Sequence, residues 1–374
     1  MEMTRPRLRE WGLRPGTLPP GAKNAITDVA DVRVGHVTLI AGDGPLSPGA
    51  GPVRTGVTIV LPHGGDLFRE RVHAAVHTIN GYGKAFGFEQ VRELGLIESP
   101  IALTNTLNVG LVADALVRHA ISRHPGIGVT TTSVNVVVGE TNDGYLNDLQ
   151  GRHVRAEHVW AAIEAASSGP VAEGAVGAGT GTSCFGWKGG IGTASRVLPL
   201  EAGGFTVGAL VQTNFGRPQQ LTVVGVPIGQ HILPSDGGDG ESVEDGSVMI
   251  VMATDAPLDS RQIRRLCARA AVGLARTGAV FDHGSGDFVI GFSTACLLPC
   301  EPDALVMERR VVVDEAVTMR WLFPAVAESV EEAVLNSLWR ARTVVGRDGN
   351  RRQALPLGPV SELLPAYGRG RSPR

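Results

Sequence analysis

The sequence predicts an α+β fold in which helices cover the outer faces of two sheets, a four-layer αββα sandwich. Three observations lead to this prediction. Several segments rich in β-branched residues are apolar at almost every position, as in strands whose two faces are both covered. Other segments carry apolar residues at helical spacing. Strands and helices also follow one another without the regular β-α-β alternation of a doubly wound sheet.

The predicted strands are short apolar segments that end at Gly, Asp or Pro. They are Val32–Leu39, Gly56–Leu61, Val134–Gly139, Phe205–Thr213, Leu221–Val226, Val248–Thr254, Phe288–Ser293 and Val306–Val313.

The predicted helices have an apolar face and recognisable ends. A capping box of Asp259 and Gln262 precedes one of them, and Gly278 ends it. The four segments are Asn108–Arg123, Ala156–Ser167, Arg261–Thr277 and Ala327–Ala341.

Composition excludes several classes of protein. The chain has 374 residues, of which 43% are hydrophobic and 19% are charged, and its net charge is −3. This is a globular composition without the basic surface that nucleic-acid binding requires. No apolar run reaches the roughly 20 residues of a membrane span, and the first residues carry no secretion signal. The four cysteines have no CxxC spacing, so we expect reduced thiols and a cytoplasmic protein.

Residues 234–246 read PSDGGDGESVEDG, with four glycines and five acidic side chains. Such a segment predicts a flexible linker. The sequence then changes abruptly at Ser247 into the apolar SVMIVMATD, which predicts a buried strand.

The Gly246–Ser247 junction allows two interpretations. One is an ordinary boundary between a loop and a strand. The other is self-cleavage, in which the Ser247 hydroxyl attacks the Gly246 carbonyl and water releases the resulting ester. Cleavage would free an α-amine with a pKa of about 7.7–8.0, which suits a general base at neutral pH. An N-terminal serine therefore carries its own base.

Two further segments carry groups that could assist such a serine. Ser285 and Asp287 lie two positions apart, so an extended chain directs both to the same side, where they could form a relay to Ser247. Asn214 ends a predicted strand, where its amide could stabilise an oxyanion. A turn motif is the alternative interpretation at both places.

Glu140 and Asn142 follow another predicted strand, in the segment GETNDGY. A carboxylate at the edge of a site could bind a substrate ammonium, although such a residue is often only a solvated turn. No segment matches a dinucleotide or P-loop motif, and Ala74 between His73 and His77 excludes HExxH. We expect no metal and no cofactor.

Taken together, these motifs resemble the family of L-aminopeptidase/D-esterase-amidases and β-peptidyl aminopeptidases. The resemblance runs nearly end to end. It rests on NAITDVADVRVGHVTL (24–39), RTGVTIVLP (54–62), GAVGAGTGTSCFGWKGGIGTASR (174–196), QTNFG (212–216), DGSVMIVMATDAPL (245–258) and GSGDFVIGFSTA (284–295).

The resemblance implies one catalytic domain over residues 1–374, with a fold like that of N-terminal-nucleophile hydrolases but different connectivity. It implies self-cleavage into an α chain (1–246) and a β chain (247–374), a tetramer of such heterodimers, and no metal. The substrates it implies are short peptides, amino-acid amides or esters that have a free amino group.

The same resemblance assigns roles by position. Ser247 matches the nucleophile, Ser285 and Asp287 match the groups beside it, and Asn214 matches the oxyanion-hole asparagine. Glu140 matches the acidic residue that receives the substrate amine. Two positions differ within the family: Asn142 stands where some members carry an aromatic residue, and Asp287 where some carry Glu.

Two other functions remain open at this stage. The related ornithine acetyltransferases share the fold and the self-processing, but they use a threonine nucleophile. An uncleaved ligand-binding relative is the non-enzymatic alternative. The preferred amino acid, its stereochemistry and the physiological substrate do not follow from the sequence.

Overall fold

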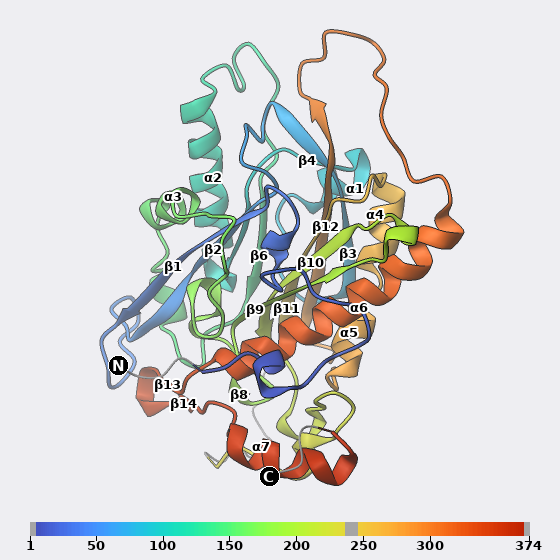
Figure 1. Ribbon diagram of the computed structural model, residues 1–374. Helices are drawn as coiled ribbons and strands as arrows, with labels where there is room; N and C mark the ends of the chain where they lie inside the picture. The colour runs from blue at the N-terminus through green and yellow to red at the C-terminus, as the bar shows by residue number, and fades with distance from the viewer. Residues whose placement is uncertain (1–4, 236–245, 370–374) are drawn as a thin grey trace.

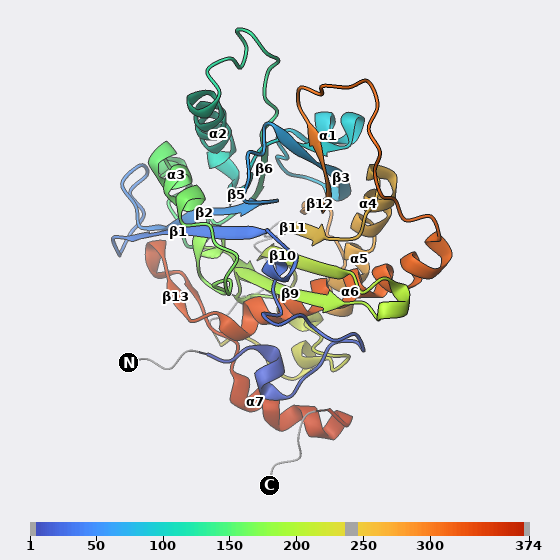
Figure 2. The ribbon, with the colours of Figure 1, turned by 45° about the horizontal axis from the view of Figure 1, so that its top comes forward.

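A computed structural model describes residues 5–235 and 246–369. Two sheets lie face to face at its centre (Figures 1 and 2). The smaller sheet has the strand order β1-β2-β5-β6, and the larger has the order β4-β3-β12-β11-β10-β9. Helices cover the outer face of each sheet (Figure 2). The predicted αββα sandwich is therefore confirmed.

Most neighbouring strands are antiparallel, and the pairs β5–β6 and β11–β12 are parallel. The smaller sheet contains β1 (Arg33–Ala41), β2 (Val53–Leu61), β5 (Ile101–Asn105) and β6 (Val137–Thr141). The larger contains β3 (Glu70–Gly81), β4 (Leu96–Ile97), β9 (Ile191–Val197), β10 (Thr206–Asn214), β11 (Ser247–Thr254) and β12 (Gly286–Pro299). Two short hairpins are formed by β7 (Ser183–Cys184) with β8 (Trp187–Lys188) and by β13 (Val344–Val345) with β14 (Arg351–Arg352).

The helices divide between the two outer layers. Helices α2 (Val109–Arg123) and α3 (Ala156–Glu164) cover the smaller sheet, and α4 (Ser260–Cys267), α5 (Ala270–Arg276) and α6 (Glu315–Arg340) cover the larger one. Helix α1 (Phe88–Leu94) packs beside β3 and β4, and α7 (Leu357–Leu363) lies near the C-terminus.

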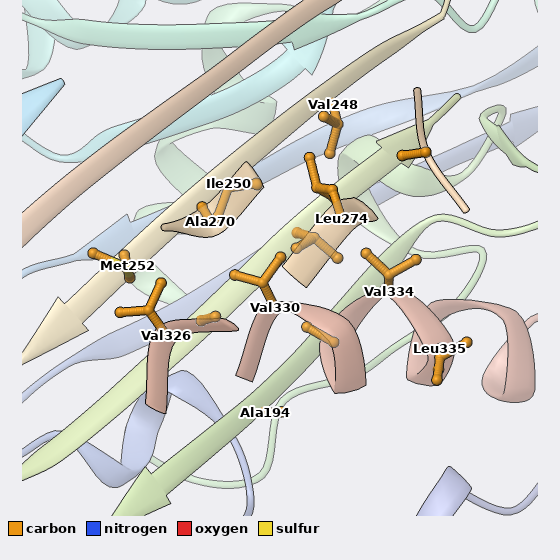
Figure 3. Packing of buried hydrophobic residues seen from close by; sticks show 14 of the residues in the cluster. Ala194, Val248, Ile250, Met252, Ala270, Leu274, Val326, Val330, Val334 and Leu335 are labelled. Atoms are coloured by element: carbon orange, nitrogen blue, oxygen red, sulfur yellow. The ribbon is translucent and has the colours of Figure 1, made fainter. Parts of the chain in front are cut away.

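Strand β11 has a buried residue at every one of its eight positions. Val248, Ile250 and Met252 face the helices α5 and α6 (Figure 3). Met249 and Val251 instead pack in the apolar layer between the two sheets. Both faces of the strand are thus covered, which explains its continuous apolar sequence.

Close approach of a helix to the larger sheet depends on a glycine. A Cβ built on Gly192 of β9 would lie 1.9 Å from the Ala333 carbonyl oxygen of α6. Only glycine allows that helix to lie so near the strand.

Two predicted strands are wrong. Residues 221–226 form a tight turn in which Val224 and Gly225 have φ of 48° and 82°, left-handed values that a strand does not contain. Residues 306–313 belong to an irregular exposed segment, where Val306 is 84% exposed. Their β-branched residues find no partner strand in the described structure.

The other differences concern strands that were missed and helix limits. The predicted segments do not include the strands β3, β5 and β9, the two-residue strands, or the short helices α1 and α7. Residues 261–277 form two helices, α4 and α5, instead of one, and α6 begins 12 residues before the predicted Ala327. Most of the predicted linker, residues 236–245, lies outside the described residues.

Within residues 5–235 and 246–369, no helix is long and apolar enough to span a bilayer. The cytoplasmic location stays a prediction.

Candidate active site

Ser247 is the first residue of β11 and is buried between two neighbouring strands. Asn214 of β10 is its antiparallel partner, and Gly286 of β12 is its parallel partner. Directly paired residues of a sheet lie on the same face. The ladder therefore brings Asn214 beside Ser247 although 33 positions separate them in the chain.

Gly246 lies between the same two flanking strands. The backbone N–H of Gly286 donates a hydrogen bond to the Gly246 carbonyl oxygen at 3.1 Å. A Cβ built on Gly246 would lie 3.3 Å from the Ser285 hydroxyl. The bond between Gly246 and Ser247 is thus held at its carbonyl and has a hydroxyl group nearby.

Ser285 donates a hydrogen bond from its hydroxyl to Asp287 Oδ1 at 2.7 Å. Burial raises the pKa of Asp287 to about 6; the Ser285 hydrogen bond opposes this shift and the charge of Asp282 adds to it. Asn80 Nδ2 lies within hydrogen-bond distance of the carbonyls of Asp282, His283 and Ser285 and holds the turn that carries Ser285.

The Ser285–Asp287 pair does not lie on the same face of the sheet as the Ser247 side chain. Asp287 pairs with Val248, which faces α5, so the carboxylate also lies on the helix side. Together with Gly246, Ser285 and Asp287 line a small cavity of about 10 Å³. Within the described chain no hydrogen bond joins Ser285 to Ser247. The pair therefore lies beside the backbone at Gly246.

The other sheet approaches Ser247 from the opposite side. Asn142, directly after β6, directs its backbone N–H at the Ser247 hydroxyl oxygen, 3.4 Å away. Its side-chain oxygen accepts a bond from Gly144 N–H at 2.9 Å, so the amide is held within its own turn. Asn142 thus presents its backbone rather than its side chain to the serine.

Glu140, on β6, is 4% exposed. Its Oε1 accepts a hydrogen bond from the Lys84 N–H at 2.9 Å. Burial raises the pKa of Glu140, against the lowering effects of the Lys84 N–H, the Lys84 charge and the Thr106 hydroxyl. A Cβ on Gly83 would contact both Glu140 Oε1 and Gly286 Cα, which places this carboxylate near the start of β12.

All of the residues predicted from the sequence therefore gather around the start of β11, on two sides of the strand. His73 and His77 lie elsewhere, on β3. In the described part of the chain, no three His, Cys, Asp or Glu side chains are grouped as metal ligands would be.

Sequence reasoning missed a buried network directly after Asn142. Asp143 accepts hydrogen bonds from the Thr55 hydroxyl at 2.5 Å and from the Asn147 amide at 3.0 Å. Burial raises the pKa of Asp143 to about 7. Thr55 in turn accepts a bond from Asn105. These contacts fix the loop that bears Asn142. The bonds from Thr55 to Asp143 and from Asn105 to Thr55 span 88 and 50 positions, so they leave no local signal.

A family model described as peptidase family S58 matches residues 24–352. The chain belongs to peptidase family S58.

Characterised relatives and solved structures agree with this assignment. Beta-peptidyl aminopeptidase BapA of Sphingosinicella microcystinivorans is 44% identical, with 97% of this chain and 93% of the relative covered. The PH0078 protein of Pyrococcus horikoshii OT3 is 48% identical, with a TM-score of 0.91 over 97% of this chain and all of the other.

The L-aminopeptidase D-Ala-esterase/amidase of Ochrobactrum anthropi has a TM-score of 0.89 and 38% identity over 98% of this chain and all of the other. It is described as a prototype for the serine aminopeptidases and a new variant among the Ntn hydrolase fold. The family and the fold predicted from the sequence are confirmed. This S58 peptidase is an aminopeptidase.

The raised pKa of Asp287 predicts a pH-dependent stability. An unfolded chain ionises this carboxyl near pH 3.9, whereas the folded chain retains the proton until about pH 6. The contribution of the protonated Asp287 carboxyl to the free energy of unfolding is therefore fully present below pH 4 and is lost as the pH rises through 6. Relative to Asp287→Asn, the free energy of unfolding should fall by about 3 kcal/mol over this window.

Urea unfolding from pH 4 to pH 8 measures this difference, with both proteins carrying Ser247→Ala to prevent cleavage before residue 247. Asp303→Asn, at an exposed position, is the matched control. Its free energy of unfolding should change with pH as that of the parent does. Parallel pH curves for the parent and Asp287→Asn would contradict the assignment.

Proposed function

We propose that Ser247 is the nucleophile of a self-processing serine aminopeptidase and that the chain divides into residues 1–246 and 247–374. The observation that carries this proposal is the position of the Gly246–Ser247 bond. Its carbonyl oxygen accepts the Gly286 N–H, and its serine lies between Asn214 and the Asn142 N–H.

Self-cleavage begins when the Ser247 oxygen attacks the Gly246 carbonyl carbon. The C–N bond breaks, the hydroxyl proton passes to the Ser247 nitrogen, and an ester joins Gly246 to the serine oxygen. The Gly286 N–H stabilises the oxygen of Gly246 as it becomes negative. Water then hydrolyses the ester and leaves Ser247 with a free amine.

Turnover repeats this chemistry on the substrate. The α-amine of Ser247 accepts the hydroxyl proton, and the oxygen attacks the substrate carbonyl. The Asn214 amide and the Asn142 N–H stabilise the oxyanion. The leaving amine or alcohol takes up the proton, and water hydrolyses the acyl-enzyme. Ser285, which donates to Asp287, lies beside Gly246, the residue whose bond to Ser247 is cleaved.

The substrates proposed are short peptides, amino-acid amides or esters with a free amino end, which Glu140 binds as an ammonium. The name of the Sphingosinicella relative makes β-amino acids the first substrates to compare. Assays should pair the p-nitroanilides of alanine and β-alanine. A further reaction containing ornithine and an acetyl donor tests the alternative acetyltransferase, which the serine at position 247 disfavours.

The nucleophile assignment predicts the mass of the purified chain. The parent protein, denatured, should give two polypeptides divided between Gly246 and Ser247. Ser247→Ala removes the attacking oxygen and should remain one inactive chain of 39.2 kDa. Intact-mass spectrometry measures both, with Ser122→Ala, an exposed serine, as the control. An active, divided Ser247→Ala protein would overturn the proposal.

The role of Glu140 predicts a selective loss of binding. Glu140→Gln should raise KM for an alanine amide about 10–100-fold, since hydrogen bonds to charged groups are the strong ones. It should leave kcat within a few fold. The analogue with a hydroxyl in place of the amine should show little difference between parent and variant. An equal effect on both substrates would contradict ammonium binding, and exposed Glu164→Gln should change neither constant.

We also propose that the protein is a tetramer of αβ heterodimers. Exposed apolar side chains in the segment 301–314 support self-association, because Leu305, Val306 and Val313 are more than four-fifths exposed. Light scattering should give four times 39.2 kDa for the parent, and a smaller mass for Leu305→Glu. A parent mass of 39.2 kDa would contradict the proposal.

A further inference from the structure

The side-chain amide of Asn214 is oriented by a residue that the sequence did not single out. Asn214 Oδ1 accepts hydrogen bonds from the Ser183 backbone N–H at 3.1 Å and from the Ser183 hydroxyl at 3.3 Å. A backbone N–H can only donate, so the oxygen of the amide must face it. The NH₂ group is therefore turned away from Ser183. Within the described chain it makes no hydrogen bond, and it remains available to a ligand.

Ser183 belongs to the β7–β8 hairpin, and residues of this hairpin and of the chain just after it contact the end of β10. The Gly190 N–H donates to the Thr213 hydroxyl at 3.0 Å, and Thr213 N–H donates to the Gly190 carbonyl at 3.0 Å. Beyond Asn214, Phe185 N–H donates to the Phe215 carbonyl at 2.7 Å, and the two rings meet edge to face. The contact of Ser183 with Asn214 thus lies between two fixed contacts.

A fully buried lysine closes this hairpin from within. Lys188 is fully buried, and its Nζ donates to the carbonyls of Gly179 at 2.9 Å, Thr182 at 2.6 Å and Gly189 at 2.8 Å. The charged amine has one hydrogen for each of these three carbonyls. Burial lowers the pKa of Lys188 to about 7. The three bonds fix the residue directly before Ser183 and so limit its movement relative to β10.

We propose that Ser183 is a positioning residue that holds the Asn214 amide with its NH₂ group directed at the oxyanion, and that Lys188 holds the hairpin that presents Ser183. The proposal rests on the proposed function, in which Asn214 stabilises the oxyanion. A terminal amide torsion is broad and nearly two-fold, so an amide without these donors would rotate. A donor oriented before the reaction needs no reorganisation in the transition state.

A double-mutant cycle separates positioning from a general structural role. Asn214→Ala should lower kcat by about 10²–10³. Ser183→Ala should lower kcat about three- to tenfold at unchanged KM, because the backbone N–H remains. In the Asn214→Ala background, Ser183→Ala should have no further effect. Rates are taken on alanine p-nitroanilide and normalised to the divided protein measured by intact mass.

An isosteric pair at the same position isolates the hydroxyl. Ser183→Thr keeps the donor and should retain at least half of the parental kcat, whereas Ser183→Val, of nearly the same shape, should reproduce the loss. If Ser183→Ala folds poorly, the comparison of Ser183→Thr with Ser183→Val tests whether the Ser183 hydroxyl positions Asn214. Ser122→Ala is the neutral control.

The outcomes distinguish the oxyanion role of Asn214 from the positioning role of Ser183. If Asn214→Ala leaves kcat unchanged, the oxyanion role in the proposed function fails. If Asn214→Ala lowers kcat but Ser183→Ala costs the same factor in both backgrounds, the positioning role fails and the proposed function stands. Equal activities for Ser183→Thr and Ser183→Val would likewise overturn the positioning role.

Discussion

The site depends on the hydrogen-bond ladder that fixes the first residue of β11 between β10 and β12. Main-chain pairing with a strand on each side positions Ser247. The same ladder places Asn214 directly beside it and the Gly286 N–H on the carbonyl before it. A buried strand has little freedom to move, so the groups that would act on one bond are oriented before any reaction occurs.

The second requirement is that the two sheets keep their relative position at this end of the sandwich. Gln212 of β10 is fully buried, and its Nε2 lies 2.8–3.0 Å from the Thr104 carbonyl, the Thr141 hydroxyl and the Ala178 carbonyl. Thr141 is the residue before Asn142, whose N–H points at Ser247. One side-chain amide thus connects the strand that carries Asn214 to the turn that approaches the serine from the other sheet. Gln212 Oε1 is buried without a hydrogen-bond partner in the described chain, so the Nε2 contacts alone make this connection.

Three carboxyl groups around the site, on Glu140, Asp143 and Asp287, all have pKa values raised by burial. The shared cause is the low exposure of the ends of β6 and β12, where apolar strands continue directly into polar turns. Removal of water strengthens hydrogen bonds and makes unpaired charges costly. For Asp143 and Asp287, whose pKa values burial raises to about 7 and about 6, the protonation state connects the stability of the fold to pH.

The sequence by itself determined the fold class, the family, a serine at the first position of a buried strand and the polar residues that lie around it. Local signals sufficed because long apolar segments, capping boxes and glycine-rich motifs report on their own surroundings. Only the tertiary structure decided that residues 306–313 are not a strand, that Asp287 lies on the helix side of the sheet, and that Ser183 faces Asn214. The physical reason is that each depends on a partner far away in the chain. A β-branched segment needs a neighbouring strand, and a hydroxyl orients an amide 31 residues away only when packing brings the two together.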